Sequence, residues 1–156
     1  MKNNKLIQGV KIKTLRLLPD ERGQLMEIIR ADDDVFEKFG QVYITTAYPG
    51  VVKAWHYHKL QNDNVTVIRG MAKIVLYDDR PKSKTNGVIN EFFIGDQNHS
   101  LIHIPKLLWH GFKCISEEMC VIINTVTECY NYRNPDEYRK PPHDAGIPYD
   151  WSRKDG

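Results

Sequence analysis

The chain has 156 residues, 41% of them hydrophobic, which is enough for one domain with a substantial apolar core. Its 22 basic and 20 acidic residues nearly cancel, and no block of Lys and Arg runs along the chain. This balance argues against binding to nucleic acid or to an anionic membrane surface. We therefore expect residues 1–156 to form a single domain whose partner is a small molecule or another protein.

The cysteines and the N-terminus indicate where such a protein works. Cys114, Cys120 and Cys129 are odd in number and lack CxxC spacing, which favours thiols in a reducing compartment over disulfides or a zinc site. The first residues contain no apolar stretch typical of a signal peptide, and no apolar run is long enough to cross a membrane. We expect a cytoplasmic protein without a membrane-spanning segment.

Short strands dominate the predicted elements. In chain order, Leu6 to Leu18 contains the alternation Val10-Lys-Ile12-Lys, and a brief helix is predicted around Asp33 to Phe39, where Asp side chains could cap a first turn. Segments rich in β-branched and aromatic residues then predict strands at 41–48, 64–69, 71–77, 89–94, 100–104 and 119–127. A second brief helix is predicted around Pro135 to Arg139, followed by an extended arm from Pro141 to Gly156 that is rich in proline.

Turn residues separate these strands, among them Pro49-Gly50, Arg69-Gly70 and Gly95-Asp96. Many short strands at this spacing predict an all-β sandwich or barrel, and a jelly-roll barrel encloses a pocket. The expected fold is therefore an all-β jelly-roll barrel with short helices and an extended C-terminal arm.

Two histidines lie two residues apart in a segment with strand character. His56 and His58 would project onto the same face, because successive side chains of a strand alternate. The spacing from Gly50 through this pair to Asp63 and Gly70, followed by Pro105-x-Leu-x-x-His110, resembles the two-part cupin signature, with Asp63 where cupins commonly have Glu and Leu107 where they have Gly. A set of three imidazoles and a carboxylate, His56, His58, Asp63 and His110, would suit a divalent first-row metal ion. Hydrogen-bonded pocket histidines without a metal are the other interpretation, and we expect no cofactor.

A longer resemblance covers most of the chain. The segments Asp20-Glu-Arg22-Gly-Gln-Leu-Met-Glu27, Gln41-Val-Tyr43, Val52-Lys-Ala-Trp-His56-Tyr, Ile104-Pro to His110-Gly-Phe, Tyr132 to Glu137, and His143-Asp144 to Trp151 are similar, in this order, to motifs of the nucleotide-sugar 3,5-epimerases. Members of that family act on dTDP-4-dehydro-6-deoxyglucose and share the cupin barrel without needing a metal. The resemblance implies an isomerase of nucleotide-sugar metabolism.

The resemblance also implies roles for individual residues. Removing the proton next to a ketone requires a positioned base and a group that stabilises the enolate oxygen. By position the base would be His56, held by Asp144, which would fix the imidazole tautomer. The resemblance also predicts a set of substrate-binding residues. These are Arg22, Glu27, Gln41, Tyr43, Lys53, His58, His110 and Glu137.

Departures from the family pattern fall on catalytic positions. The matching position for the family's proton-donating tyrosine is Ile123, and Tyr132 or Tyr130 is the nearby replacement that we expect to reach the pocket. The lysine that stabilises the enolate is absent, and Asp63 is the nearby charged residue. His58 as imidazolium, or a metal ion, is expected to take over that role.

Three alternatives stay open. The segment Trp55-His56-Tyr-His58-Lys59 also resembles the 3,4-ketoisomerases, smaller cupins that act on the same class of sugar nucleotide. A metal-dependent cupin enzyme and a non-catalytic module that binds sugar nucleotides are the others. The epimerase resemblance further implies a homodimer in which strands near the N-terminus cross to the second subunit and close its site.

Overall fold

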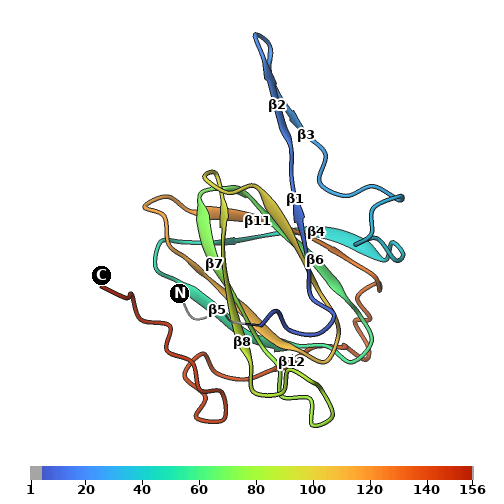
Figure 1. Cartoon of the computed structure of the whole chain (residues 1–156), viewed down its shortest axis with the longest axis vertical. Coiled ribbons are helices and arrows are strands. Elements are labelled where there is room, and N and C mark those ends of the chain that lie inside the picture. The colour runs from blue at the N-terminus through green and yellow to red at the C-terminus, as the bar shows by residue number, and fades with distance from the viewer. Residues whose placement is uncertain (1–4, 156) are drawn as a thin grey trace.

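The computed structural model describes residues 5–155, and its strands form two five-stranded antiparallel sheets (Figure 1). The first sheet has the order β1 (Lys11–Thr14), β9 (Ser100–Ile104), β6 (Asp63–Arg69), β11 (Cys120–Val126) and β4 (Gln41–Ala47). The second has the order β12 (Tyr138–Arg139), β5 (Val52–Tyr57), β10 (Trp109–Cys114), β7 (Met71–Tyr77) and β8 (Ile89–Gly95). The prediction of an all-β fold is confirmed.

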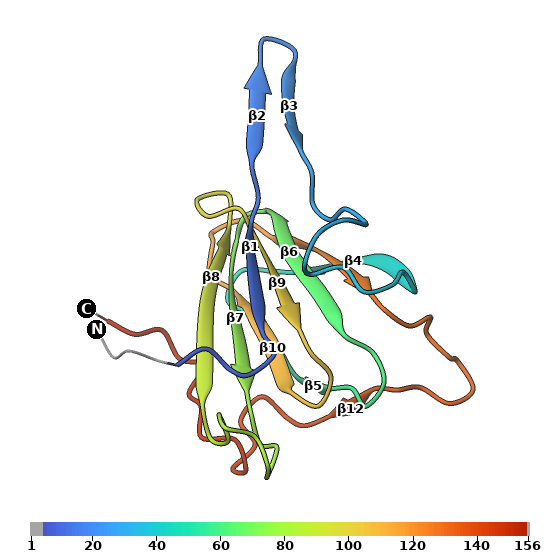
Figure 2. The same cartoon turned by 45° about the vertical axis from the view of Figure 1, so that its right-hand side comes forward.

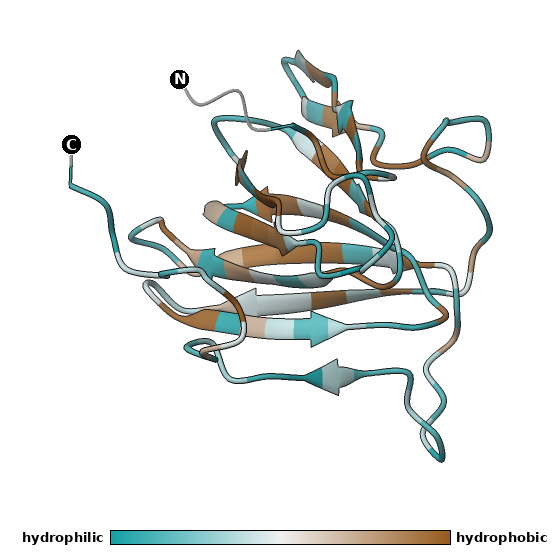
Figure 3. Cartoon of the chain, turned by 60° about the horizontal axis from the view of Figure 1, so that its bottom comes forward, coloured by the Kyte–Doolittle hydropathy of each residue, from teal (hydrophilic) through white to brown (hydrophobic). Residues whose placement is uncertain are grey.

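The main core lies between the two sheets. It includes Ile74 and Leu76 of β7, Ile102 and Ile104 of β9, and Ile122 of β11, each no more than 2% exposed. Figure 3 shows that hydrophobic residues concentrate on the strands, whereas loops and the C-terminal tail are mostly hydrophilic. The alternation of side chains along each strand therefore produces a sandwich with an apolar interior.

A second apolar cluster lies on the other face of the second sheet. Trp55 of β5 and Trp109 of β10 pack there against Ile147 and Trp151 of the C-terminal arm. The arm has no strand or helix from Lys140 to Asp155, as expected for an extended segment. Its apolar side chains cover the sheet and make the arm part of the fold.

Both predicted helices are wrong. Residues 33–35 form a bend and a turn, and residues 36–39 are irregular, because the Asp33 carboxylate accepts a hydrogen bond from the backbone N–H of Arg30 and pairs with Lys13 instead of capping a helix. Within the second predicted helix, around 135–139, Tyr138 and Arg139 pair with β5 and form β12. Their backbone groups bond to the sheet and are therefore not available for a helix. No helix occurs between residues 5 and 155, and hence none that could span a membrane.

A separate hairpin projects from the barrel. It is formed by β2 (Leu17–Asp20) and β3 (Gly23–Met26), which pair only with each other (Figures 1 and 2). The apolar side chains of Leu18 and Leu25 are exposed on it. The hairpin therefore extends away from the interior of its own chain.

Candidate active site

A cavity of about 1090 Å³ opens beside the main core, between the two sheets. Its walls come from β4, β6 and β11 of one sheet, from β5 and β10 of the other, from residues 58–61 after β5, and from the segment 128–142. Val65, Phe112 and Ile122 belong both to the core and to the cavity wall. The site is thus an interior pocket held by rigid strands.

Strand alternation decides which side chains enter the cavity. On β4, Gln41, Tyr43 and Thr45 line the cavity, whereas Val42 and Ile44 point to the opposite face. His56 near the end of β5 and His58 just after that strand both line the cavity. The two histidines therefore share a face, as their spacing predicts.

Three imidazoles lie close together. The ring centroid of His110 lies 5.8 Å from that of His56 and 5.3 Å from that of His58. Burial, together with the neighbouring His110, lowers the pKa of His56 to about 4, while the charge of Glu137 acts in the opposite direction. Burial and His58 likewise lower the pKa of His110 to about 3. Both rings are therefore neutral near pH 7.

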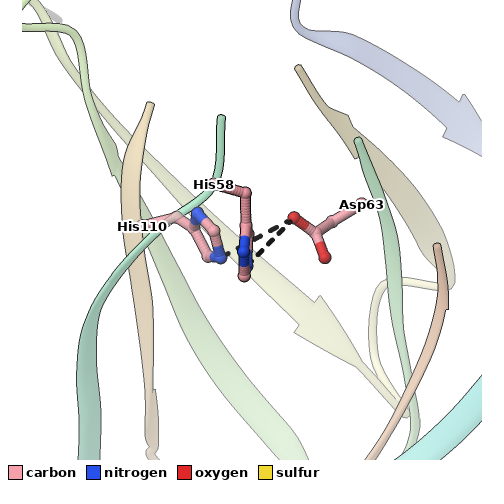
Figure 4. A group of neighbouring side chains, drawn as sticks. All are labelled: His58, Asp63 and His110. Carbon is pink, nitrogen blue, oxygen red and sulfur yellow. Dashed lines mark ion pairs between the residues drawn. The ribbon is translucent and has the colours of Figure 1, made fainter. Parts of the chain in front are cut away.

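Asp63 is a fully buried carboxyl group beside these rings. Its Oδ1 accepts hydrogen bonds from Gln61 Nε2 at 3.1 Å and from Asn124 Nδ2 at 2.7 Å. Its Oδ2 lies 3.8 Å from Nε2 of both His58 and His110 (Figure 4). Burial raises the pKa of Asp63, although the charge of His58 and the two amide bonds oppose this.

The Nδ1 atoms of His58 and His110 each face a backbone carbonyl. His58 Nδ1 contacts the carbonyl oxygen of Asp136, and His110 Nδ1 lies 3.2 Å from that of Leu108. These contacts place the proton on Nδ1 and leave the Nε2 lone pairs facing Asp63. One ligand atom from each of His58, Asp63 and His110 lies within 4.8 Å of the others. Two imidazoles and one carboxylate fit a divalent first-row metal ion. His56 lies outside this set.

Asp136 holds this part of the site in place. Its carboxylate accepts hydrogen bonds from the backbone N–H groups of Lys59, Leu60 and Gln61, at 2.7 to 3.2 Å. These bonds lower the pKa of Asp136 against the effect of its burial. The carboxylate therefore anchors the segment before β12 to the end of β5, beside His58.

Cationic side chains line the cavity where it meets solvent. Lys53 Nζ donates to Thr45 Oγ1 at 3.2 Å, and Arg139 pairs with Glu137 at 2.8 Å. Lys140 is a third cation on this wall and lies 3.5 Å from the carboxylate of Asp144. Three cations at the edge of a pocket suit the phosphates of a nucleotide.

The structure brings seven of the predicted site residues into the cavity wall. These are Gln41, Tyr43, Lys53, His56, His58, His110 and Glu137.

The other four predicted residues lie elsewhere. Arg22 is exposed on the projecting hairpin and pairs with Asp20, and Glu27 pairs with Arg30 beyond that hairpin. Tyr132 is 89% exposed and does not line the cavity, although Tyr130 on the same segment between β11 and β12 does.

Asp144 is also separated from the predicted base. Its carboxylate accepts a hydrogen bond from the backbone N–H of Gly146 and pairs with Lys140, and no ion pair joins it to His56. The carboxylate whose charge acts on His56 is Glu137. In this structure Glu137 therefore acts on the predicted base through its charge, whereas the carboxylate of Asp144 pairs with Lys140.

On β11 the residue that enters the cavity is Asn124 and not its neighbour. Ile122 and Asn124 line the cavity, whereas Ile123 pairs with Ile44 in the register of β4 and points to the opposite face. Neither Ile122 nor Asn124 carries an acidic proton. The cavity therefore receives no proton donor from β11.

Sequence reasoning missed Asn124, Asp136, Arg139 and Lys140 as site residues. The alternation of β11 carried a signal for Asn124, since it follows a buried isoleucine by two residues. For Asp136 and the two cations there was no such signal, because their segment reaches the site through a long loop.

A model of the polysaccharide biosynthesis C-terminal domain family matches residues 18–138. The chain is 42% identical over 148 residues to the probable low-salt glycan biosynthesis epimerase Agl13 of Haloferax volcanii, covering 94% of this chain and 95% of that protein. Its structure matches that of a dTDP sugar isomerase from Desulfovibrio desulfuricans G20 with a TM-score of 0.90 and 30% identity, covering 96% and 94% of the two chains.

A further solved structure carries a ligand. It is the dTDP-6-deoxy-D-glucose-3,5-epimerase RmlC of Legionella pneumophila Philadelphia 1, in complex with dTDP-4-keto-L-rhamnose. The match has a TM-score of 0.82 and 26% identity, and it covers 95% of this chain and 81% of that one.

Proposed function

This chain belongs to the RmlC-like family of cupin-fold dTDP-sugar epimerases, and we propose that it is itself a nucleotide-sugar epimerase. The substrate in this proposal is an NDP-4-keto-6-deoxyhexose, and the reaction removes and returns a proton at C3, C5 or both. The single observation that carries the proposal is the neutral imidazole of His56, which faces a 1090 Å³ cavity with cations at its edge. Residues 1–156 act in it as one catalytic domain.

His56 is the base of this reaction. A neutral imidazole has a free lone pair, and the carbon next to a ketone is acidic enough to react with a positioned base. The charge of Glu137 stabilises the imidazolium that forms, because it raises the pKa of His56 against the effect of burial. Lys53, Arg139 and Lys140 bind the diphosphate and so orient the sugar toward His56.

Deuterium exchange tests the proposal directly. The purified protein is incubated in heavy water with a panel of NDP-4-keto-6-deoxy sugars, and NMR follows label entering C3 and C5 and the configuration of the product. His56→Ala is expected to abolish exchange while nucleotide binding is retained. His143→Ala, an exposed histidine outside the cavity, is the matched control and should behave as the unchanged protein. Exchange that survives in His56→Ala would show that another group is the base.

The same experiment separates the neighbouring functions. A 3,4-ketoisomerase would move the ketone from C4 to C3, and NMR would show this as a different product. A non-catalytic binding module would retain the sugar nucleotide without incorporating any label.

A metal-dependent reaction is the second candidate, because His58, Asp63 and His110 offer three ligand atoms that lie within 4.8 Å of one another. A metal ion held by these residues would polarise the ketone oxygen and stabilise the enolate. Elemental analysis of the purified protein and exchange measured after dialysis against a chelator test this. Full exchange by metal-free protein would refute the second candidate, and so would full exchange by His58→Ala.

We also propose that the protein is a homodimer in which each subunit completes the site of the other. The β2–β3 hairpin projects from its own barrel (Figure 2), and Arg22 at its turn does not line the cavity of its own chain. The outer face of β4 exposes apolar side chains as well, since Val42 is 55% and Ile44 is 62% exposed. A two-fold axis would place the hairpin of each subunit at the cavity of its partner.

Mixing two inactive variants tests this arrangement. If a site uses His56 of one subunit and Arg22 of the other, random exchange of His56→Ala and Arg22→Ala subunits restores about a quarter of all sites. Recovery of activity to about that level, together with a dimer mass by light scattering, is the expected result. A monomer, or no recovery after subunit exchange, would contradict it.

The proposed location is a reducing compartment such as the cytoplasm. Cys114, Cys120 and Cys129 are all free thiols, which fits a compartment in which disulfides do not persist.

A further inference from the structure

Epimerisation needs a proton donor in addition to the base, and this requirement follows from the proposed function. Inverting a carbon means that the proton leaves one face and another arrives at the opposite face. The strand β11 presents only Ile122 and Asn124 to the cavity, and neither can donate such a proton. Another side chain has to carry out this step.

Tyr43 is a tyrosine on a rigid strand of the cavity wall. It lies on β4 of the first sheet, whereas His56 lies on β5 of the second sheet, and both line the same cavity. A sugar between the sheets therefore has the imidazole on one side and the phenol on the other. This is the arrangement that inversion requires.

Hydrogen bonds fix the direction in which the phenol can donate. The amide oxygen of Asn124 accepts a hydrogen bond from the backbone N–H of Asn64 at 3.2 Å, which identifies the two atoms of this amide. Its nitrogen then donates to Asp63 Oδ1 at 2.7 Å and to the hydroxyl oxygen of Tyr43 at 2.8 Å. Because the phenol oxygen accepts this bond, its own hydrogen is free for a partner in the cavity.

The phenol also keeps its proton near pH 7. Burial raises the pKa of Tyr43 to about 12, and the charge of Asp63 contributes in the same direction, against the effect of the Asn124 bond. A tyrosine in this state is an acid and cannot act as a base. Asn124 is the positioning residue, since it holds the phenol and the Asp63 carboxyl together.

We propose that Tyr43 is the catalytic proton donor of this enzyme, in place of the tyrosine that β11 lacks. His56 takes the proton from the carbon next to the ketone, and the electrons of that C–H bond form the enolate. Tyr43 then delivers its hydroxyl proton to the opposite face of the same carbon, where the enolate electrons form the new C–H bond and the carbonyl is restored. One proton passes from the imidazolium to the phenolate through solvent, and both groups return to their starting states.

The test uses Tyr43→Phe, which removes only the hydroxyl group. The variant is expected to incorporate deuterium next to the ketone at a rate similar to that of the unchanged protein, with retained configuration. Formation of the epimer should fall about 10²- to 10⁴-fold, the usual contribution of a general acid. Tyr48→Phe, an exposed tyrosine just beyond the end of β4, is the matched control and should epimerise normally.

Tyr130 is the competing donor, because it also lines the cavity. Loss of the epimer in Tyr130→Phe, with normal epimerisation by Tyr43→Phe, would overturn the inference and leave the proposed function intact. Loss of both label and epimer in a Tyr43→Phe protein with an unchanged melting temperature would also overturn it, because Tyr43 would then be needed for the first step. If the unchanged protein incorporates no label from any sugar of the panel, the proposed function falls, and the inference falls with it.

A second variant covers the case in which Tyr43→Phe does not fold. Replacement of Tyr43 by 3-fluorotyrosine keeps the hydroxyl group and lowers the pKa of the phenol. The alkaline limb of epimer formation should then move to lower pH, while deuterium incorporation keeps its pH profile. An epimerisation profile that does not move would refute the assignment.

Discussion

Trp151 is the residue of the C-terminal arm whose removal should cost the most stability. It is 1% exposed, and its ring centroid lies 5.0 Å from that of Trp55 and 4.9 Å from that of Tyr149. Its carbonyl oxygen accepts a hydrogen bond from Lys113 Nζ at 2.7 Å. Trp151 therefore fastens the arm to the outer face of β5 and β10 through both its indole ring and its backbone carbonyl.

The magnitude follows from the buried area. A buried aromatic side chain removes about 150–250 Å² from water, which at roughly 25 cal/mol per Å² corresponds to about 4–6 kcal/mol. A compact unfolded chain reduces this by about 10–40%, so Trp151→Ala should lower the free energy of unfolding by about 2–5 kcal/mol. The indole Nε1 is buried without a hydrogen-bond partner, so Trp151→Phe removes an unsatisfied donor and should cost less than the alanine variant.

Urea unfolding followed by circular dichroism measures both variants. Tyr132→Ala, which removes an exposed aromatic ring, is the control and should change the free energy of unfolding by less than about 0.5 kcal/mol. A loss below about 1 kcal/mol in Trp151→Ala would show that the arm is a loose tail. It would refute the reasoning that the arm completes the second apolar cluster.

Three further predictions concern the site and the adjacent barrel. In Gly111→Ala the new Cβ would lie 2.3 Å from the Cβ of Ala54, so β10 and β5 must separate. We expect the free energy of unfolding in urea to fall by about 1–3 kcal/mol and deuterium exchange to slow. Unchanged values for both would contradict the close approach of the two strands. Because the pKa of His56 is lowered to about 4, the proposed base stays neutral as pH falls. The value of kcat/KM for exchange should therefore be constant from about pH 8 to 5 and drop only near pH 4. A drop near about pH 6.5, the ordinary pKa of histidine, would contradict a buried base. Asp78 is fully buried; burial alone would raise its pKa, but hydrogen bonds led by that from Arg80 lower it. The stability that Asp78 contributes is therefore fully present above about pH 4, its pKa in the unfolded chain, and is lost as pH falls below that value. Asp78→Ala should lower the free energy of unfolding by about 3–5 kcal/mol at pH 7. Its stability in urea should also depend less on acid pH than that of the unchanged protein.

Much of the fold was predictable because strands leave a strong local signal. Alternation and β-branched residues placed the strands at 71–77 and 100–104 at their observed bounds. The two helices failed because short polar segments carry little periodicity, and the outcome depended on partners elsewhere in the chain. Asp33 bonds to Arg30 and Lys13, and residues 138–139 pair with β5.

The candidate site was predictable to a similar extent. The spacing of His56 and His58 was sufficient to place both on one face, since the period of a strand is two. On β11, counting along the family motif reached Ile123, whereas the strand presents Asn124 to the cavity. A shift of one residue moves a side chain to the other face of a sheet, so motif counting alone cannot decide such a position.

The sequence by itself determined the all-β class, the positions of β4, β6, β7, β8, β9 and β11, the apolar interior and the histidine pair, because each depends on patterns within a few residues. Only the tertiary structure decided that Tyr43 meets Asn124 and Asp63, that Glu137 and not Asp144 acts on His56, and that Arg22 does not line the cavity of its own chain. Those relations join segments about 20 to 80 residues apart. Strand order and register set them, and no local pattern in the chain encodes either.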